Sequence, residues 1–291
     1  MKIVRTVDEV RPLLHGVVGL VPTMGALHDG HRSLLRAARA ENELVVASLF
    51  VNAAQFGEQA DLDAYPRDEA GDARVAAESG VDVLFAPSTA EMYPAGFATW
   101  VDVENTGAEG AARPGHFRGV ATVCLKLFTI IRPQRAYFGQ KDAQQAAVIR
   151  QLVRDLNLEL EVRVLPTVRD TDGLALSSRN ARLSAEERAR ALQLPRGLAA
   201  GAAAYPAGGD PVAAARAAMN GLSPEYVEVV YLGDATILAA AARIGGTRLI
   251  DNVVLEGELP GATSPSATRP GPPASCRCRS CSRCSGAARR S

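Results

Sequence analysis

The sequence has little of what marks membrane, secreted or nucleic-acid-binding proteins. No apolar run approaches the ~20 residues of a membrane helix, and the start MKIVRTVDEV lacks the basic-then-apolar order of a signal segment. The 32 Lys and Arg residues balance 32 Asp and Glu residues, so there is no excess of cations for a broad nucleic-acid footprint. We therefore expect a cytoplasmic protein that acts on small molecules, with no membrane or nucleic-acid partner.

Cysteine is also scarce where the chain is patterned for folding. Of five cysteines, Cys124 lies alone in an apolar run, which predicts a buried thiol, and four crowd between 276 and 284. No disulfide framework follows from this distribution. Four thiolates could hold a structural zinc, but their close spacing leaves almost no loop for a folded knuckle. Because the end of the chain is rich in Pro, Gly, Ser, Ala and Arg without periodicity, we expect residues 258–291 to be a disordered tail.

The remaining sequence predicts an α/β fold of two domains. Strand-like runs at 17–21, 44–51, 81–85, 136–138 and 160–165 alternate with helical patterns near 31–41, 67–79, 120–131 and 142–156. Strands that are apolar on both faces are typical of a parallel sheet flanked by helices. Residues 1–168 are therefore expected to form a doubly wound, Rossmann-like nucleotide-binding domain.

A smaller α+β domain is expected over residues 169–257. Ser184 and Glu187 have the spacing of a capping box at a helix start, and Ala-rich helical patterns continue to about residue 220. Two short β runs, 226–231 and 248–255, complete this domain. The sequence becomes more polar after Pro166, and this change marks the boundary between the two domains.

The most informative run, at 21–31, joins the end of an apolar strand to a helix that opens with His28 and His31. Unpaired N–H groups and the helix dipole favour a phosphate at such a helix start. Gly25 and Gly30 let the backbone approach a ligand closely. Two histidines in a polar turn can be incidental, but the chain has only four, and this placement predicts a nucleotide-phosphate site.

Carboxamides follow the second predicted strand, at the edge where open parallel sheets place their ligands. Asn52 and Gln55 could hydrogen-bond a hydroxyl or a carboxylate there without adding charge. The alternative is a loop-capping Asn beside an exposed Gln. The basic loop at 113–119 suits an anion in the same way, with a solvated surface loop as its alternative.

A third junction, at 138–145, follows the strand at 136–138. Gly139 permits close backbone approach, Lys141 offers a point charge for phosphate, and Asp142 can accept a hydrogen bond from a ribose hydroxyl. Gln145 could bind a polar group of a substrate. A charged helix start capped by Asp142 explains the same residues equally well.

The turn Ser177-Ser178-Arg179 supplies two hydroxyls and a guanidinium, which suits the outer phosphates of a triphosphate. A simple turn into the next helix is the alternative.

Six ordered motifs together resemble the pantoate:β-alanine ligase family, also called pantothenate synthetases. They are P-T-M-G-A-L-H-x-G-H at 22–31, V-N-x-x-Q-F at 51–56, D-x-x-x-Y-P at 61–66, R-P-x-H-F-x-G-V at 113–120, F-G-x-K-D-x-Q-Q at 138–145 and D-G-L-A-x-S-S-R-N at 172–180. The resemblance extends to L-I-D-N at 249–252 and stops near Gly257. Six motifs in one order are far more specific than any one of them.

The resemblance implies a two-step ligation. The pantoate carboxylate attacks the α-phosphorus of ATP to give pantoyl adenylate and pyrophosphate, and the amine of β-alanine then releases AMP. The residues that it implies for catalysis are His28, His31, Lys141, Ser177 and Arg179. Those implied for ATP are Met24, His28, His31, Gly139, Lys141, Asp142, Val168, Ser177, Ser178 and Arg179, and those for pantoate are Met24, Asn52, Gln55 and Gln145.

These roles agree with the chemistry of the residues. An in-line displacement needs charge stabilised on the phosphates, which cations, imidazole donors and Mg²⁺ can do, and no nucleophilic side chain is required. The sequence has no dedicated carboxylate cage, so Mg²⁺ is expected to be held mainly by the phosphates of ATP and water. A homodimer is expected only because similar enzymes are dimers.

Three positions depart from the family pattern. Ala53 replaces a proline, Ala143 an aromatic residue, and Ala108 a leucine before Glu109, a residue that the resemblance puts at the pocket edge. None of the three removes a charged group from the predicted site. Two rival hypotheses remain: a nucleotidyltransferase that transfers AMP or CMP to a phosphate, and a non-catalytic nucleotide-binding homologue.

Overall fold

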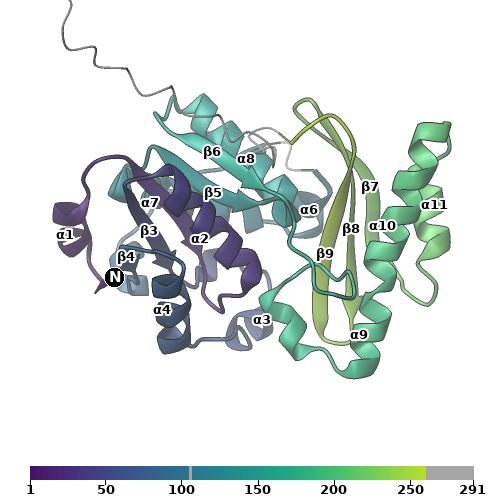
Figure 1. Ribbon diagram of the computed structural model, residues 1–291, viewed down its shortest axis with the longest axis horizontal. Coiled ribbons are helices and arrows are strands. Elements are labelled where there is room, and N and C mark those ends of the chain that lie inside the picture. Colours follow the sequence, from purple (N-terminus) through teal and green to yellow (C-terminus); the bar gives the residue numbers. More distant parts are fainter. Residues whose placement is uncertain (105–106, 260–291) are drawn as a thin grey trace, which may run out of the picture.

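The computed structural model describes residues 1–104 and 107–259 (Figure 1). The tail predicted for 258–291, with its four cysteines between 276 and 284, lies outside the described residues apart from Glu258 and Leu259. Leu259 is only 6% exposed and packs into the main hydrophobic core. The packed chain therefore extends two residues past the expected boundary.

Six parallel strands form the larger sheet. They are β1 (Lys2–Val4), β2 (Val18–Thr23), β3 (Leu44–Leu49), β4 (Val83–Phe85), β5 (Arg135–Gly139) and β6 (Glu161–Leu165). Their spatial order is β1-β4-β3-β2-β5-β6. The chain therefore builds outward from β2 on one side and returns to pair β5 with β2 on the other. In a doubly wound sheet this reversal opens a crevice at the carboxyl ends of the two strands where it occurs, here β2 and β5.

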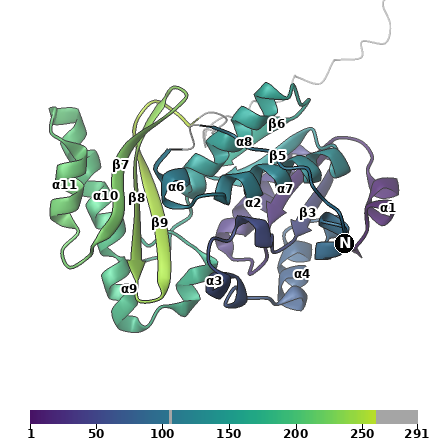
Figure 2. The ribbon, with the colours of Figure 1, turned by 180° about the vertical axis from the view of Figure 1, so that it is seen from behind.

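Helices cover both faces of this sheet (Figures 1 and 2). On one face, α2 (Asp29–Glu41) and α4 (Glu69–Glu78) bury Leu35 and Ala76 against β3 and β4. On the other face, α7 (His116–Ile131) contacts β2, and α8 (Ala143–Asp155) contacts β5 and β6. Because both faces of the inner strands are buried, β2, β3 and β4 are apolar along most of their length, as the sequence predicted.

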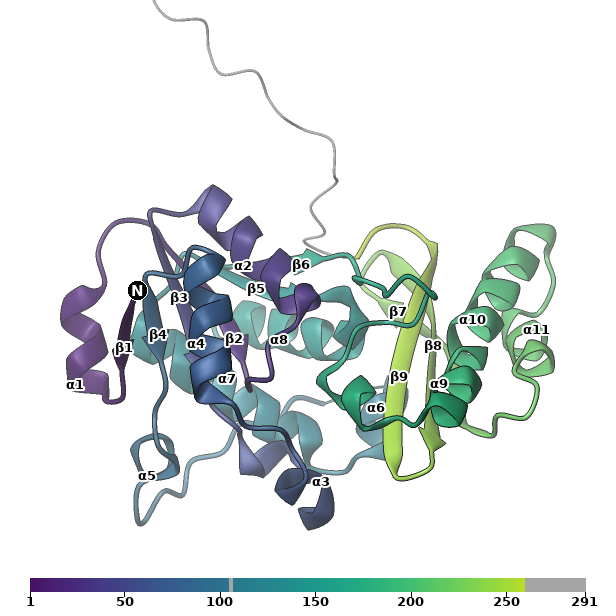
Figure 3. The same ribbon diagram turned by 60° about the horizontal axis from the view of Figure 1, so that its bottom comes forward.

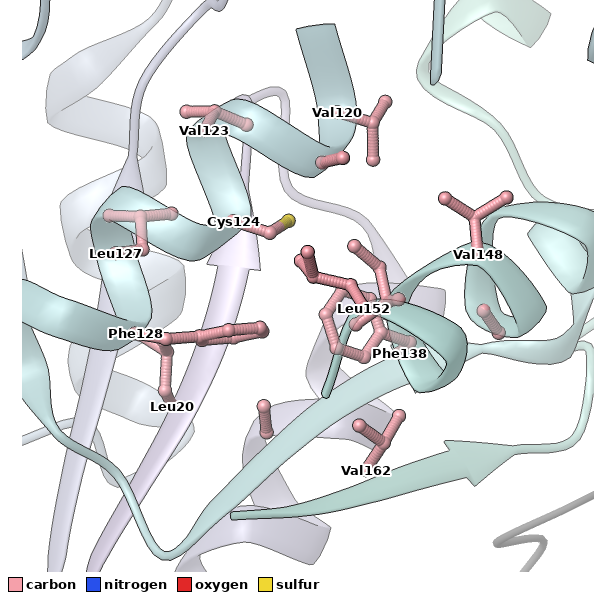
Figure 4. Close-up of a cluster of buried hydrophobic side chains, with 14 of the residues drawn as sticks. Leu20, Val120, Val123, Cys124, Leu127, Phe128, Phe138, Val148, Leu152 and Val162 are labelled. Atoms are coloured by element: carbon pink, nitrogen blue, oxygen red, sulfur yellow. The ribbon is translucent and has the colours of Figure 1, made fainter. Parts of the chain in front are cut away.

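Cys124 lies in the core between α7 and the sheet, among apolar side chains from α8 and three strands (Figure 4). It is 4% exposed and forms no disulfide, which confirms the predicted buried thiol. Burial raises the pKa of this thiol to about 12. The group is therefore an apolar packing unit rather than a nucleophile.

Short helices connect the main elements of this unit. They are α1 (Val7–Val10), α3 (Gln59–Asp63), α5 (Thr89–Met92) and α6 (Gly107–Ala112), with 3-10 turns at Arg11–Leu13, Ala53–Gln55 and Gln140–Asp142. The turns at Ala53–Gln55 and Gln140–Asp142 follow β3 and β5, so they carry polar residues to the crevice. No helix in the described residues is long and apolar enough to cross a membrane.

A second, antiparallel sheet is built from β7 (Pro224–Leu232), β8 (Ala235–Ile244) and β9 (Thr247–Glu256). Helices α9 (Ala185–Ala191), α10 (Gln193–Ala204) and α11 (Pro211–Ala218) cover the face of this sheet that is turned away from the parallel sheet (Figure 3). The capping box of Ser184 and Glu187 starts α9, as predicted. 3-10 turns at Ser178–Arg182 and Tyr205–Ala207 complete the elements.

The central strand β8 is apolar on both sides. Leu238 and Ala240 pack on the covering helices, whereas Ile237 and Ala239 belong to the core of the parallel-sheet unit. The two units thus share a continuous apolar contact.

The predicted fold class, a doubly wound parallel sheet with a smaller α+β part, is confirmed, but two strands were missed. β1 has only three residues, too few to show a periodic pattern. β8 contains the run Ala239-Ala240-Ala241-Ala242, which favours a helix by composition. It is a strand because both of its faces are covered and its edges are paired with β7 and β9, so tertiary contacts override local propensity.

Candidate active site

A cavity of about 230 Å³ opens at the carboxyl ends of β2 and β5, where the sheet order reverses. Every predicted site residue lines it: Met24, His28, His31, Asn52, Gln55, Gly139, Lys141, Asp142, Gln145, Val168, Ser177, Ser178 and Arg179. They come from the segments that follow β2, β3, β5 and β6, including the first turns of α2 and α8, and from the turn before α9. The fold therefore gathers, in one place, motifs that are far apart along the chain.

His28 and His31 form a reciprocal cap at the start of α2. The Nδ1 atom of His28 accepts a hydrogen bond from the backbone N–H of Gly30 at 3.1 Å, and His28 N–H donates to Nδ1 of His31 at 3.3 Å. The two ring centroids lie 4.2 Å apart. Because each Nδ1 accepts a hydrogen bond, the proton of each neutral ring is on Nε2.

Both rings are neutral at physiological pH. Burial, with a smaller contribution from the charge of Lys141, lowers the pKa of His28 to about 4. Burial and then the neighbouring His28 lower the pKa of His31 to about 3. The pair therefore offers two uncharged Nε2–H donors to a ligand in the cavity, and the positive charge of the site must come from other residues.

The cations that line the cavity are Lys141, Arg179 and Arg113. Lys141 is largely buried and lies 3.5 Å from the carboxylate of Asp142. Its backbone carbonyl accepts a hydrogen bond at 2.9 Å from Asn252 of β9, so the antiparallel sheet holds the turn that carries it. Asp142 has a half-exposed carboxylate at the cavity wall, where it could accept a hydrogen bond from a ligand hydroxyl.

Arg179 donates to Asp61 of α3 at 2.8 Å, and Arg182 donates to the other oxygen of the same carboxylate at 3.1 Å. The Arg179 guanidinium also lies over the ring of Tyr65. Burial alone would raise the pKa of Asp61, but the hydrogen bonds and charges of the two arginines outweigh it and hold this pKa below its usual range. A phosphate that binds Arg179 must compete with this carboxylate, which keeps Arg182 as its partner.

The serines of the same turn lie beside this ion pair. Ser177 Oγ accepts from the backbone N–H of Arg179 at 3.3 Å, and Ser178 Oγ contacts the hydroxyl of Tyr65 at 3.4 Å. Val168 also lines the cavity, and its carbonyl accepts a hydrogen bond from Leu176 N–H at 3.0 Å.

The carboxamides form a second, uncharged wall. The amide of Asn52 is fully engaged: it donates to Gln55 Oε1 at 3.0 Å and to Gly119 O at 3.1 Å, and accepts from Tyr93 at 2.9 Å. Gln55 in turn donates to Met24 Sδ at 3.1 Å. Asn52 thus orients Gln55, while Gln55 and Met24 face the cavity together.

In the basic run at 113–119, Arg113 and His116 line the cavity and are not solvated surface residues, because His116 is buried and the Arg113 side chain is only 21% exposed. His116 Nδ1 bonds the backbone carbonyl of Gln55 at 2.8 Å, so it is the donor, and Nε2 can accept from Arg113 at 3.2 Å. Burial and the charge of Arg113 lower the pKa of His116 to about 4. Arg113 also donates to the Gln55 carbonyl at 3.2 Å. Both residues therefore fix the backbone of Gln55, a role that the sequence did not reveal.

Two small residues leave room around the site. Apart from its chain neighbours, a Cβ atom at Gly139 would meet no protein atom within 4 Å, so the space beside it is open. Ala143, where the family pattern has an aromatic residue, lines a small cavity of about 30 Å³ between the two units. Glu109 is buried and also lines this cavity.

Several residues that hold the site were not predicted from the sequence. Asp61, Tyr65 and Asn252 stand in recognised motifs, which could have marked them, although their contacts could not be read from the motifs. Asp72 accepts a hydrogen bond from Leu27 N–H in the loop before His28, and Arg248 donates to Glu109. Neither was marked by the sequence, because an acidic residue in the first turn of a helix, such as Asp72, and a cation in a strand, such as Arg248, are common on protein surfaces.

Comparison with known proteins agrees with this geometry. The sequence model of the family described as "Pantoate-beta-alanine ligase" matches residues 2–254. A pantothenate synthetase of Roseiflexus castenholzii is 50% identical over 277 residues, covering 88% of this chain and 100% of the relative. One from Rhizorhabdus wittichii is 51% identical over 279 residues, with 88% and 99% covered.

Solved structures show the same likeness. A pantothenate synthetase from Thermus thermophilus has a TM-score of 0.84 at 46% identity and covers 88% of this chain and 100% of its own. Pantoate-beta-alanine ligase from Francisella tularensis, in a complex with beta-gamma ATP and beta-alanine, has a TM-score of 0.74 at 35% identity, with 89% and 99% covered. With a matching family model, half-identical relatives and the same fold, the chain belongs to the pantoate-beta-alanine ligase family.

Proposed function

We propose that this enzyme condenses pantoate with β-alanine to form pantothenate, with ATP as the activating substrate and pantoyl adenylate as the intermediate. Membership of the family supports the overall reaction. The single observation that supports the two-step mechanism is the cavity itself, which brings uncharged carboxamides and the pair His28 and His31 into one space, with no activated nucleophilic side chain among the described residues that line it.

In the first step a pantoate carboxylate oxygen attacks the α-phosphorus of ATP. An O–P bond forms, the bond to the bridging oxygen breaks, and pyrophosphate leaves. The Nε2–H groups of His28 and His31 donate to the phosphates, while Lys141 and Arg179 compensate the charge that develops on them. Gln55 and Gln145 hold pantoate through neutral hydrogen bonds, so its carboxylate is not trapped in a salt bridge.

In the second step the amine of β-alanine attacks the acyl carbon of the adenylate. A C–N bond forms, the amine loses a proton, and AMP leaves with the electrons of the C–O bond. A wider cleft of about 800 Å³ between the two units shares Lys141, Asp142 and Arg179 with the cavity and gives β-alanine a route to the adenylate. We propose that residues 1–168 act as the catalytic unit and residues 169–257 as a lid over this cleft.

We propose that Mg²⁺ enters as its complex with ATP. No group of three or more His, Cys, Asp or Glu side chains in residues 1–104 and 107–259 could hold a metal ion. A protein cage for the ion does not fit these residues, and the phosphates with water remain as its ligands. When bound, Mg²⁺ would neutralise part of the phosphate charge.

Product analysis tests the reaction. Incubation with pantoate, β-alanine and ATP should give pantothenate, AMP and pyrophosphate, and pyrophosphate should exchange into ATP only when pantoate is present. ADP with inorganic phosphate would overturn the adenylate mechanism. A dinucleotide product would favour the nucleotidyltransferase alternative, and no turnover at all would favour the non-catalytic homologue.

Variants test the roles. His28→Ala and Lys141→Ala should each lower kcat of adenylation by about 10²- to 10³-fold, the scale for losing one preorganised donor. Both should affect aminolysis of preformed pantoyl adenylate much less. His15→Ala removes an exposed histidine and should change neither half-reaction. Equal damage to both half-reactions by the first two variants would contradict the assignment. The predicted homodimer and cytoplasmic location stay predictions, and sedimentation velocity would check the former.

A further inference from the structure

Asp72 is a buried carboxylate that the proposed mechanism does not use. Three carboxylate residues among the described residues are buried: Asp72, Glu109 and Asp251, at 4%, 4% and 3% exposure. Arg248 pairs with Glu109, and Arg169 with Asp251. Asp72 forms no ion pair with a Lys or Arg in the described part of the chain. A buried charge needs compensation, and for Asp72 this comes from the backbone of the loop before His28.

The contact joins α4 to the loop between β2 and α2. Asp72 Oδ2 accepts from Ala26 N–H at 2.9 Å, and Oδ1 accepts from Leu27 N–H at 2.7 Å. The loop backbone is unusual here, because Gly25 has a φ of 88° and Ala26, which is not a glycine, a φ of 51°. Such a conformation in a residue with a side chain persists where its surroundings impose it. The paired hydrogen bonds to Asp72 are one such constraint.

Packing at Gly25 shows how closely this loop is held. A Cβ atom there would lie 2.7 Å from Asp72 Oδ2 and 2.8 Å from Leu49 Cδ1, both shorter than normal contacts. The carboxylate therefore sets how near the loop approaches α4. The residues that flank the segment 25–27 both lie in the site. Met24 accepts a hydrogen bond from Gln55 through its sulfur, and His28 begins the histidine cap.

We propose that Asp72 is a positioning residue for adenylation, which fixes the loop so that His28 and Met24 meet ATP and pantoate in productive geometry. This inference rests on the proposed function. The N–H groups of Ala26 and Leu27 each bind a different oxygen of Asp72. A carboxylate offers two such acceptor oxygens, whereas an amide of the same shape offers only one. The substitution Asp72→Asn would direct an NH₂ group at one backbone N–H, so it should displace the loop while the side-chain volume stays the same.

The first test compares Asp72→Asn with Asp68→Asn in full-length protein. Asp68 caps the same helix through Gly71 N–H at 2.9 Å but does not contact the loop, so it controls for loss of helix stability. Asp72→Asn should lower kcat of pantoate-dependent pyrophosphate exchange by about 10- to 100-fold, the scale of a small misplacement of catalytic groups. Aminolysis of preformed pantoyl adenylate should change much less. Asp68→Asn should change both by less than about twofold.

A second readout does not depend on the reaction. Nitrogen-15 NMR of the histidine rings should show Nδ1 unprotonated and Nε2 protonated for His28 and His31 in the parent protein, and altered populations of these tautomers in Asp72→Asn. If the parent protein forms no AMP and pyrophosphate, the proposed function fails, and the tautomer change still decides whether Asp72 holds the loop.

Several results would overturn the proposal. These are unchanged exchange kinetics in a folded Asp72→Asn protein, equal losses in both half-reactions, and parent-like tautomers in the variant. If Asp72→Asn does not fold, Gly25→Ala perturbs the same contact from the loop side. It should give the same loss of adenylation with aminolysis retained, and the absence of that split would count against Asp72.

Discussion

Replacing Glu109 by Gln should destabilise the protein far more than a surface change. Glu109 of α6 is buried and receives two hydrogen bonds from Arg248 of β9, at 2.8 and 2.9 Å, and one from Tyr226 of β7 at 2.9 Å. It therefore ties the parallel-sheet unit to the antiparallel sheet. Arg113, which fixes the backbone of Gln55, lies 3.4 Å from the same carboxylate.

The size of the expected loss of stability in Glu109→Gln follows from the burial of this ion pair. Removing one partner of a buried ion pair costs about 3–5 kcal/mol, because the other charge stays buried without compensation. Arg248 keeps Glu225 at 2.7 Å, so the lower value of about 3 kcal/mol applies. For a chain of this size, 1 kcal/mol corresponds to about 2–4 °C in Tm. Calorimetry at pH 7 should therefore show Tm lowered by about 6–12 °C.

The matched control is Glu58→Gln. Glu58 and Arg243 also join the two units, at 2.9 Å, but their side chains are 61% and 43% exposed. An exposed pair contributes little, so this variant should keep the parent Tm within about 2 °C. If the Glu109 and Glu58 variants lose the same small amount, the buried pair does not hold the units together and the argument from burial is wrong.

The pH dependence has a definite sign. Burial alone would raise the pKa of Glu109, but hydrogen bonding and charge from Arg248, with Arg113 and Tyr226, outweigh it and lower the pKa below the ordinary 4.5. Stability from such a group is present above the unfolded pKa and is lost as pH falls through the lower, folded pKa. The Tm difference between the parent and Glu109→Gln should thus be constant above about pH 5.5 and shrink below about pH 4.5; a constant difference down to about pH 3 would refute this.

Three further predictions concern the site and the end of the chain. Gln55→Ala should raise the KM for pantoate at least about tenfold, the loss of one or two hydrogen bonds, and leave the KM for ATP nearly unchanged; equal effects would contradict its place beside pantoate. Because His28 and His31 have pKa values of about 4 and 3, kcat of adenylation should stay within about twofold from about pH 6.5 to 8, and a fall with an apparent pKa near 6.5 would show that one of them titrates. Truncation after Leu259 should preserve Tm and kcat/KM, whereas truncation after Gly257 removes a buried leucine and should lower Tm by several degrees.

Five of the six parallel strands could be predicted from the sequence because they contain buried apolar runs, whereas β1, with three residues at the edge of the sheet, could not. β2 and β3 appear in the sequence as continuous apolar runs, which few other structures produce. β8 could not be recognised in the same way. Its alanines fit closely between α10 and the parallel-sheet unit, and that need for small residues comes from the packing of the two units rather than from the strand itself.

In the candidate site, too, some residues could be predicted from the sequence and others could not. Residues that face the ligand stand at strand ends in short motifs, so their types and spacing could be interpreted from the sequence alone. Residues that hold those groups come from distant segments: Asp72 lies 46 positions from Ala26, and Arg248 lies 139 positions from Glu109. Such pairs depend on tertiary packing, which a single sequence does not reveal.

The three site histidines show why residue type alone was insufficient. At His28 and His31 each Nδ1 accepts a backbone N–H, so Nε2 carries the proton. At His116 the ring is reversed: Nδ1 donates to the carbonyl of Gln55, and Nε2 accepts. The same neutral imidazole therefore presents an N–H donor to the cavity in one wall and holds the backbone of Gln55 in the other. In the proposed mechanism burial keeps all three histidines uncharged, so the charge of a bound triphosphate is compensated by the cations that line the cavity, Lys141, Arg179 and Arg113, and not by protonated histidines.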